Sequence, residues 1–117
     1  MHSLARISVA LLSLALAQPL FAQGQPIKIY GLVELSGTGA TSGTNFNDGV
    51  KLAVKEINAA GGILGRKVEY SASDTQSQPQ VAKALAVKAI DDGAYIVMGP
   101  VFSGSILVSM AETKRAE

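Results

Sequence analysis

The sequence contains no cysteine, and its single histidine is His2. Without cysteine the chain can form no disulfide and no thiolate metal site, and it offers no cysteine for an N-terminal lipid. Without a later histidine, neither a serine–histidine pair nor a histidine-ligated metal can form in the rest of the chain. These absences exclude cysteine- and histidine-based catalytic and metal sites after residue 2. We expect a protein that is not an enzyme and has no catalytic residues, no metal and no cofactor.

The first 22 residues have the pattern of a secretory signal peptide. His2 and Arg6 make a weakly basic start, residues 7–17 (ISVALLSLALA) are apolar, and a short helix-breaking stretch ends at Ala22. The apolar run is shorter than the roughly 20 residues that span a bilayer. We predict cleavage after Ala22, with a rival site after Ala17, and export of a soluble protein to the periplasm.

Charge is sparse and balanced after the signal segment. The chain has ten basic and nine acidic residues, and removing residues 1–22 takes away Arg6 and no acid. A net charge near zero gives no electrostatic case for binding nucleic acid or an anionic membrane surface. The 48% hydrophobic content, although inflated by the signal segment, fits a folded α/β protein.

Three predicted strands alternate with three predicted helices. The strands are residues 27–33 (IKIYGLV), 67–71 (KVEYS) and 94–98 (AYIVM). The first helix should begin near Asn45, after a loop rich in glycine, serine and threonine at residues 36–44, and end at Gly61 and Gly62. The other helices are predicted at residues 80–90 and 103–116. The residues expected on the buried sides of the first and third helices are Phe46, Val50, Ala53, Val54, Ile57, Ile106, Leu107, Met110 and Ala111.

The alternation predicts an α/β fold with a parallel, Rossmann-like sheet between two helical layers. Right-handed crossovers would give the strand order 2-1-3. Three strands leave two bare sheet edges, and the chain from residue 23 to residue 117 is small for a doubly wound domain. We therefore interpret residues 23–117 as the incomplete N-terminal part of a larger unit.

Ligands of open parallel sheets bind beyond the carboxyl ends of the strands, which here are residues 34–44, 73–79 and 99–105. These loops are rich in hydroxyl, amide and glycine residues, which suits neutral hydrogen bonding better than acid–base catalysis. Ser103 is placed to be a helix N-cap, and the N–H groups of Gly104 and Ser105 would then be unpaired. A carboxylate could accept hydrogen bonds from these groups near the positive end of the helix dipole. Alternatively, Ser103 only caps its own helix.

The first loop offers a rival interpretation as a dinucleotide site. Gly37, Gly39 and Gly43 resemble a loosened dinucleotide fingerprint after a strand. That fingerprint requires a helix that begins inside the glycine run and an acid about 20 residues later. The helical pattern begins only near Asn45, and the acid that follows the second strand, Asp74, is too distant. An exported nucleotide-dependent enzyme is therefore the weaker alternative.

Several motifs together resemble the leucine/isoleucine/valine-binding family of periplasmic solute-binding proteins, the extracytoplasmic receptors of ABC importers. The resemblance covers nearly all of residues 23–117, and its most specific motifs are the GGILGRK run and the GP-x-x-S-G-S loop. The matching stretches are residues 27–31 (IKIYG), 35–37 (LSG), 49–58 (GVKLAVKEIN), 59–67 (AAGGILGRK), 74–77 (DTQS) and 99–105 (GPVFSGS).

The resemblance implies two lobes joined by a hinge, with the ligand captured between them, so that this chain is the first part of lobe 1. It implies that Ser103 binds a ligand carboxylate with help from the backbone of the same loop. At the position of Ser42 the family often has an aromatic residue, and serine here leaves room for ligands other than leucine. The candidate ligand-binding residues are Ser42, Asp74, Gln76, Ser103, Gly104 and Ser105.

The function implied is capture of a branched-chain or other amino acid, or a related small carboxylate, in the periplasm. The partners would be that ligand and an ABC permease in the inner membrane, and the full-length protein would be a monomer. A ligand-sensing receptor domain of the same fold is the alternative.

Overall fold

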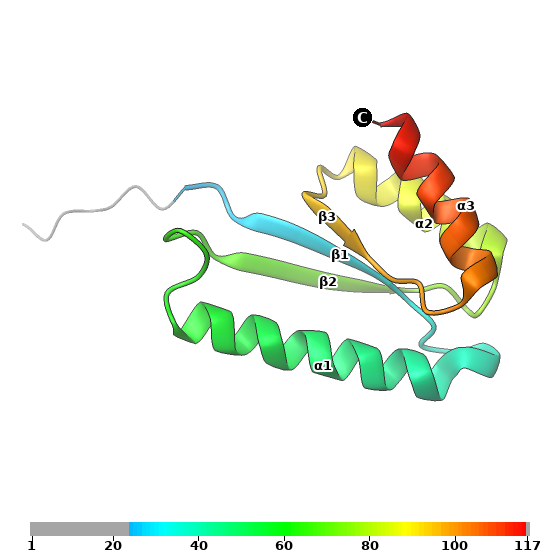
Figure 1. Cartoon of the computed structure of the whole chain (residues 1–117), viewed down its shortest axis with the longest axis horizontal. Coiled ribbons are helices and arrows are strands. Elements are labelled where there is room, and N and C mark those ends of the chain that lie inside the picture. Colours follow the sequence, from blue (N-terminus) through cyan, green and yellow to red (C-terminus); the bar gives the residue numbers. More distant parts are fainter. Residues whose placement is uncertain (1–23, 117) are drawn as a thin grey trace, which may run out of the picture.

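The computed structural model of the chain describes residues 24–116 (Figure 1). The predicted signal peptide, residues 1–22, lies outside the described residues. The elements are β1 (Ile27–Val33), the short 3-10 helix η1 (Gly37–Gly39), α1 (Ala40–Ala59), β2 (Val68–Asp74), α2 (Pro79–Asp91), β3 (Ile96–Met98) and α3 (Ser103–Arg115).

The three strands form one parallel sheet in the order β2-β1-β3, which confirms the predicted topology. β2 is longer than predicted because every residue of β1 has a partner on it, from Ile27 with Val68 to Val33 with Asp74. β3 is shorter than predicted because it pairs only with the middle of β1, from Ile29 to Gly31. Asp74 is consequently the last residue of a strand and lies directly beside the end of β1.

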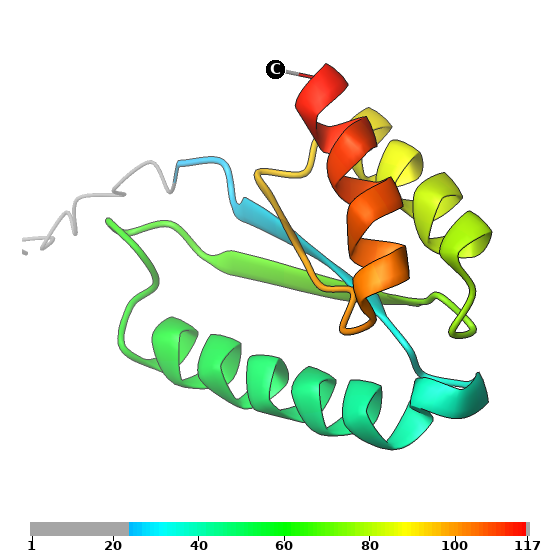
Figure 2. The ribbon, with the colours of Figure 1, turned by 45° about the vertical axis from the view of Figure 1, so that its right-hand side comes forward.

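The helices cover both faces of the sheet, as predicted for a three-layer fold. α1 lies on one face, and α2 and α3 lie side by side on the other (Figures 1 and 2). The buried apolar residues come from the strands and from α2, whose inner face is built from alanines. They are Ile27, Leu32, Val33, Val68, Ala82, Ala86 and Ala89.

The predicted loop at residues 36–44 is wrong, because helix begins there. η1 starts at Gly37 and α1 starts at Ala40, about five residues before the predicted start near Asn45. Glycine, serine and threonine are poor helix formers, so local propensity argued against this turn. The packing of Gly43 on the end of β1 compensates, because only a residue without a side chain allows this close approach.

The predicted apolar side of α1 is only partly buried. The fully buried residues of the helix are Gly43 and Asn47, whereas Phe46, Val50, Val54 and Ile57 are half-buried and Ala53 is exposed. The five apolar residues of α1, together with Ile29 of β1 and Met98 of β3, line an open apolar hollow of about 470 Å³. The pattern identified the correct face of α1, which residues 24–116 leave partly uncovered.

The predicted buried side of α3 is wrong for its largest residues. Leu107 is 71% exposed and Met110 is 60% exposed, and Ala111 is also exposed. α3 instead buries Ser105 and Ser109, one turn apart, beside the alanine face of α2. Small side chains on both helices allow their backbones to approach closely. The contact is therefore made by serines and not by the predicted leucine and methionine.

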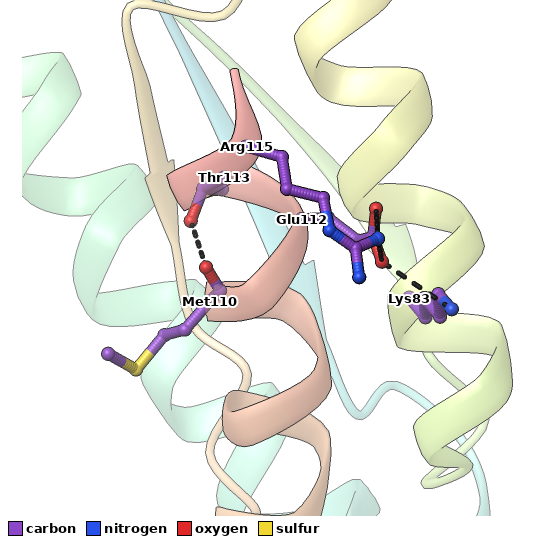
Figure 3. Close-up of polar contacts among 5 residues, drawn as sticks. All are labelled: Lys83, Met110, Glu112, Thr113 and Arg115. Carbon is purple, nitrogen blue, oxygen red and sulfur yellow. Dashed lines mark hydrogen bonds and ion pairs between the residues drawn. The ribbon is translucent and has the colours of Figure 1, made fainter. Parts of the chain in front are cut away.

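One polar cluster joins the first half of α2 to the last turns of α3 (Figure 3). The carboxylate of Glu112 lies 3.4 Å from the ammonium of Lys83 on α2 and 2.9 Å from the guanidinium of Arg115 on α3. The two cations are largely exposed, so each pair contributes at most about 1 kcal/mol. The cluster therefore adds little to the stability of the helix pair.

Replacing Ser109 by alanine is expected to stabilise the protein. The Ser109 hydroxyl is buried and has no hydrogen-bond partner among the described residues. Removing a buried, unpaired hydroxyl relieves a desolvation cost, so the free energy of unfolding of the complete mature protein should rise by about 0.5–1 kcal/mol. Urea unfolding measures this, with Ser71→Ala on the exposed side of β2 as the control. A loss of 1 kcal/mol or more would show that the hydroxyl has a partner.

Candidate functional site

Asp74 joins the loops that follow β1 and β2. Its Oδ1 accepts hydrogen bonds from the N–H groups of Leu35 (2.9 Å), Ser36 (3.1 Å) and Gln76 (2.8 Å), and its Oδ2 accepts one from the Ser36 hydroxyl (2.6 Å). Desolvation by itself would raise the pKa of Asp74, but these four hydrogen bonds outweigh it and lower the pKa below its ordinary value. The ionised carboxylate therefore holds the two loops together.

The second loop turns sharply immediately after Asp74. Gln76 and Ser77 both have positive φ, at 55° and 58°, which is uncommon for residues other than glycine. The Ser77 hydroxyl donates to the carbonyl of Ser36 (2.7 Å) and accepts from the N–H of Gly39 (3.0 Å). Two site residues were predicted in this loop. The carboxylate of Asp74 is occupied by hydrogen bonds to the loops, whereas Gln76 lies exposed at the tip.

Glu34 joins the loops that follow β1 and β3, and sequence reasoning did not single it out. It is completely buried, and its carboxylate accepts hydrogen bonds from the N–H groups of Val101 (3.0 Å) and Phe102 (3.1 Å). The sequence did contain a signal. An acidic residue directly after the apolar run of a buried strand lies where the loops of a parallel sheet meet.

The glycines of the first loop serve packing. A Cβ on Gly43 would lie 2.0 Å from the carbonyl oxygen of Glu34, and one on Gly39 would lie 2.8 Å from the ring of Phe102. Helix begins inside this glycine run, so one sequence-based argument against a dinucleotide site is wrong. The close packing of the start of α1 on Glu34 and Phe102 nevertheless explains the glycines without a bound nucleotide.

The third loop ends in a row of N–H groups without partners at the start of α3. The residue in the N-cap position is Phe102, with no side-chain cap, so the interpretation of Ser103 as the cap of its own helix is wrong. Within residues 24–116, no acceptor pairs with the N–H groups of Ser103, Gly104 or Ser105, and the first helical bond runs from Ile106 to Phe102. Ser103 and Gly104 are exposed, whereas the Ser105 side chain is buried.

Ser42 lies in the first turn of α1, and its side chain is exposed. α1 and α3 both begin at the end of the sheet where the strands finish (Figure 2). The structure therefore brings Ser42, Gln76, Ser103 and Gly104 to one end of the sheet as exposed residues. Asp74 is half-buried and the side chain of Ser105 is buried, so both lie behind these exposed residues.

The sequence model of the family described as periplasmic binding protein matches residues 26–115. The chain belongs to this family. In the part of the chain that the structure describes, no helix is long and apolar enough to cross a membrane. The same residues contain no group of three or more carboxylate, histidine or cysteine side chains that could hold a metal ion.

Two curated proteins are similar in sequence to this chain. The chain is 40% identical over 73 residues to the Leu/Ile/Val-binding protein BraC3 of Rhizobium johnstonii, which covers 62% of this chain and 20% of that protein. It is 36% identical over 92 residues to the Leu/Ile/Val-binding protein of Escherichia coli strain K12, covering 79% of this chain and 25% of that one. This chain spans only a fifth to a quarter of the length of these relatives.

A solved family member shows the same arrangement. The structure is the branched-chain amino acid transporter substrate-binding protein LivJ of Streptococcus pneumoniae, in complex with isoleucine. It superimposes with a TM-score of 0.76 at 36% identity, over 78% of this chain and 26% of that chain. The fold of residues 24–116 is therefore that of one part of a periplasmic binding protein.

Proposed function

We propose that the complete protein is the substrate-binding component of an ABC-type importer. It captures a branched-chain or other amino acid, or a related small carboxylate, in the periplasm and carries out no chemical reaction on it. The observation that carries this proposal is the row of N–H groups at the exposed residues Ser103 and Gly104, which have no acceptor within residues 24–116, in a chain of the periplasmic binding protein family. The binding partners named for its relatives support the ligand class.

The start of α3 has the chemistry that a carboxylate requires. One carboxylate oxygen would accept from the Ser103 hydroxyl and the other from the N–H groups of Gly104 and Ser105, close to the positive end of the helix dipole. Bonds of this kind to a charged acceptor are stronger than neutral ones. Ser42 and Gln76, exposed at the same end of the sheet, would contact the rest of the ligand.

The remaining steps follow from the family architecture. Residues 1–22 would direct export and be removed, and residues 23–117 would form the first part of lobe 1. A second lobe would close over the ligand, and the closed form would dock on a permease in the inner membrane as a monomer. Because a ligand shifts the lobes only by its greater affinity for the closed state, contacts at Ser103 would act through that closure.

Replacing Ser103 by alanine tests the carboxylate site. In the complete mature protein, loss of one hydrogen bond to a charged group should weaken binding about tenfold. Isothermal titration with L-leucine, L-isoleucine, L-valine, L-phenylalanine and benzoate would measure this. Ser71→Ala, an exposed serine on β2, is the matched control. Unchanged affinity in Ser103→Ala would remove the role assigned to Ser103, and wild-type protein that binds none of these acids would contradict the proposed ligand class.

A further inference from the structure

Glu34 has no partner that would explain a buried charge in the usual way. Glu34 is 0% exposed, and no ion pair to its carboxylate occurs among residues 24–116. Burying a carboxylate is costly unless hydrogen bonds compensate. Here the compensation comes from two successive N–H groups of one loop, at Val101 and Phe102.

The position of those two donors in the chain is what gives Glu34 its significance. Val101 and Phe102 immediately precede Ser103, Gly104 and Ser105, whose N–H groups have no acceptor among the described residues. The five N–H groups are consecutive. The buried carboxylate thus occupies the inner part of a row of donors and leaves the outer part available.

The surroundings of Glu34 hold it rigidly. A Cβ on Gly43 would lie 2.0 Å from its carbonyl oxygen, and one on Gly39 would lie 2.9 Å from its Cβ, so the start of α1 packs directly on this residue. Gly39 also contacts Phe102 from the same side. The carboxylate of this fully buried residue therefore ties Val101 and Phe102 to the end of β1 and to the start of α1.

We infer that Glu34 is the positioning residue of the ligand site: it fixes the loop before α3 so that the N–H groups of Ser103 to Ser105 face the ligand before it arrives. The inference rests on the proposed function and names a residue for it beyond those that touch ligand. Pre-organised donors bind more tightly because ordering them costs nothing at the moment of binding. Glu34 therefore contributes to affinity without contacting the ligand.

Amide hydrogen exchange of the complete mature protein, resolved by residue with NMR, tests the inference without any variant. The Val101 and Phe102 amides should exchange at least tenfold more slowly than those of Ser103 and Gly104 in the ligand-free protein. Equal, fast exchange at all four positions would overturn the inference. This readout does not depend on which ligand binds.

The variant Glu34→Gln adds the link to binding. Its amide retains one acceptor but presents an NH₂ group to a loop N–H, so exchange at Val101 and Phe102 should accelerate about tenfold and the Kd for L-isoleucine should rise about five- to tenfold. Glu56→Gln, on the exposed side of α1, is the matched control and should change neither. If Glu34→Gln fails to fold, Glu34→Asp, one methylene shorter, gives the same two readouts.

The outcomes separate this inference from the proposed function. Faster exchange with an unchanged Kd would overturn the inference and leave the proposed function standing. Wild-type protein that binds no L-isoleucine or other acid, yet shows slow exchange at Val101 and Phe102, would overturn the proposed function while the loop-positioning role of Glu34 is supported.

Discussion

Gly43→Ala should destabilise the complete mature protein by about 3 kcal/mol or more. The added Cβ would lie 2.0 Å from the carbonyl oxygen of Glu34 and 2.6 Å from its carbonyl carbon. Both are backbone atoms of β1's end, so no side-chain rotation relieves the clash and the helix must move away from the sheet. Urea unfolding measures the loss, and the shift of α1 should also weaken ligand binding through the disturbed loops.

Gly49→Ala on the same helix is the matched control. A Cβ at Gly49 meets nothing within 4 Å, and the residue is exposed in the middle of α1. Alanine is the better helix former, so this variant should gain about 0.5–1 kcal/mol. If the two variants changed stability by similar amounts, the close approach of α1 to Glu34 would not exist.

Asp74→Asn should destabilise the protein by about 1–2 kcal/mol at neutral pH. Asparagine keeps one acceptor oxygen but places an NH₂ group among the donors of Leu35, Ser36 and Gln76. The loops after β1 and β2 would separate, and the change should appear as faster hydrogen exchange at Leu35 and Ser36. Chemical unfolding at pH 7 gives the stability.

The same variant should show a distinctive pH dependence. The pKa of Asp74 in the folded protein is below its ordinary value of 3.8, so the unfolded state takes up its proton first as the pH falls. The contribution of Asp74 is therefore fully present above about pH 4–5 and is lost as the pH falls through the folded pKa. The stability difference between wild type and Asp74→Asn should shrink as the pH falls below about 4. A stability difference that stayed constant with pH would contradict the role of the charge.

The order and type of the elements could be predicted because they depend on local pattern. Apolar clustering marked β1 and β3, and Gly61 and Gly62 ended the helical pattern of α1 within a few residues of its observed end at Ala59. The strand order 2-1-3 followed from the handedness of parallel crossovers. The start of α1 could not be predicted in the same way, because the packing of Gly43 on Glu34 overrides the weak helix propensity of its first turn.

The structure shows where the candidate site residues lie, and their contact with a ligand stays a prediction. The sequence located the loop at Ser103, since glycine and serine before a helical pattern indicate a helix start at the end of a strand. It assigned Asp74 to ligand contact, whereas the structure shows the Asp74 carboxylate occupied by loop hydrogen bonds. It missed Glu34. The position of this acid directly after the apolar run of β1 was a signal, but nothing local to residue 34 identifies its hydrogen-bond partner at Val101, 67 residues away.

The sequence by itself determined the α/β class, the parallel topology, the family and the end of the sheet at which a ligand would be sought. Each of these follows from periodicity, turn residues or local motifs that neighbouring residues carry together. Only the tertiary structure decided which polar groups are occupied and which are free. Asp74 and Glu34 bind backbone N–H groups of other loops, while those of Ser103 and Gly104 stay without an acceptor in the described part of the chain. The physical reason is that hydrogen bonds between loops depend on distances across the sheet, which chain spacing does not encode.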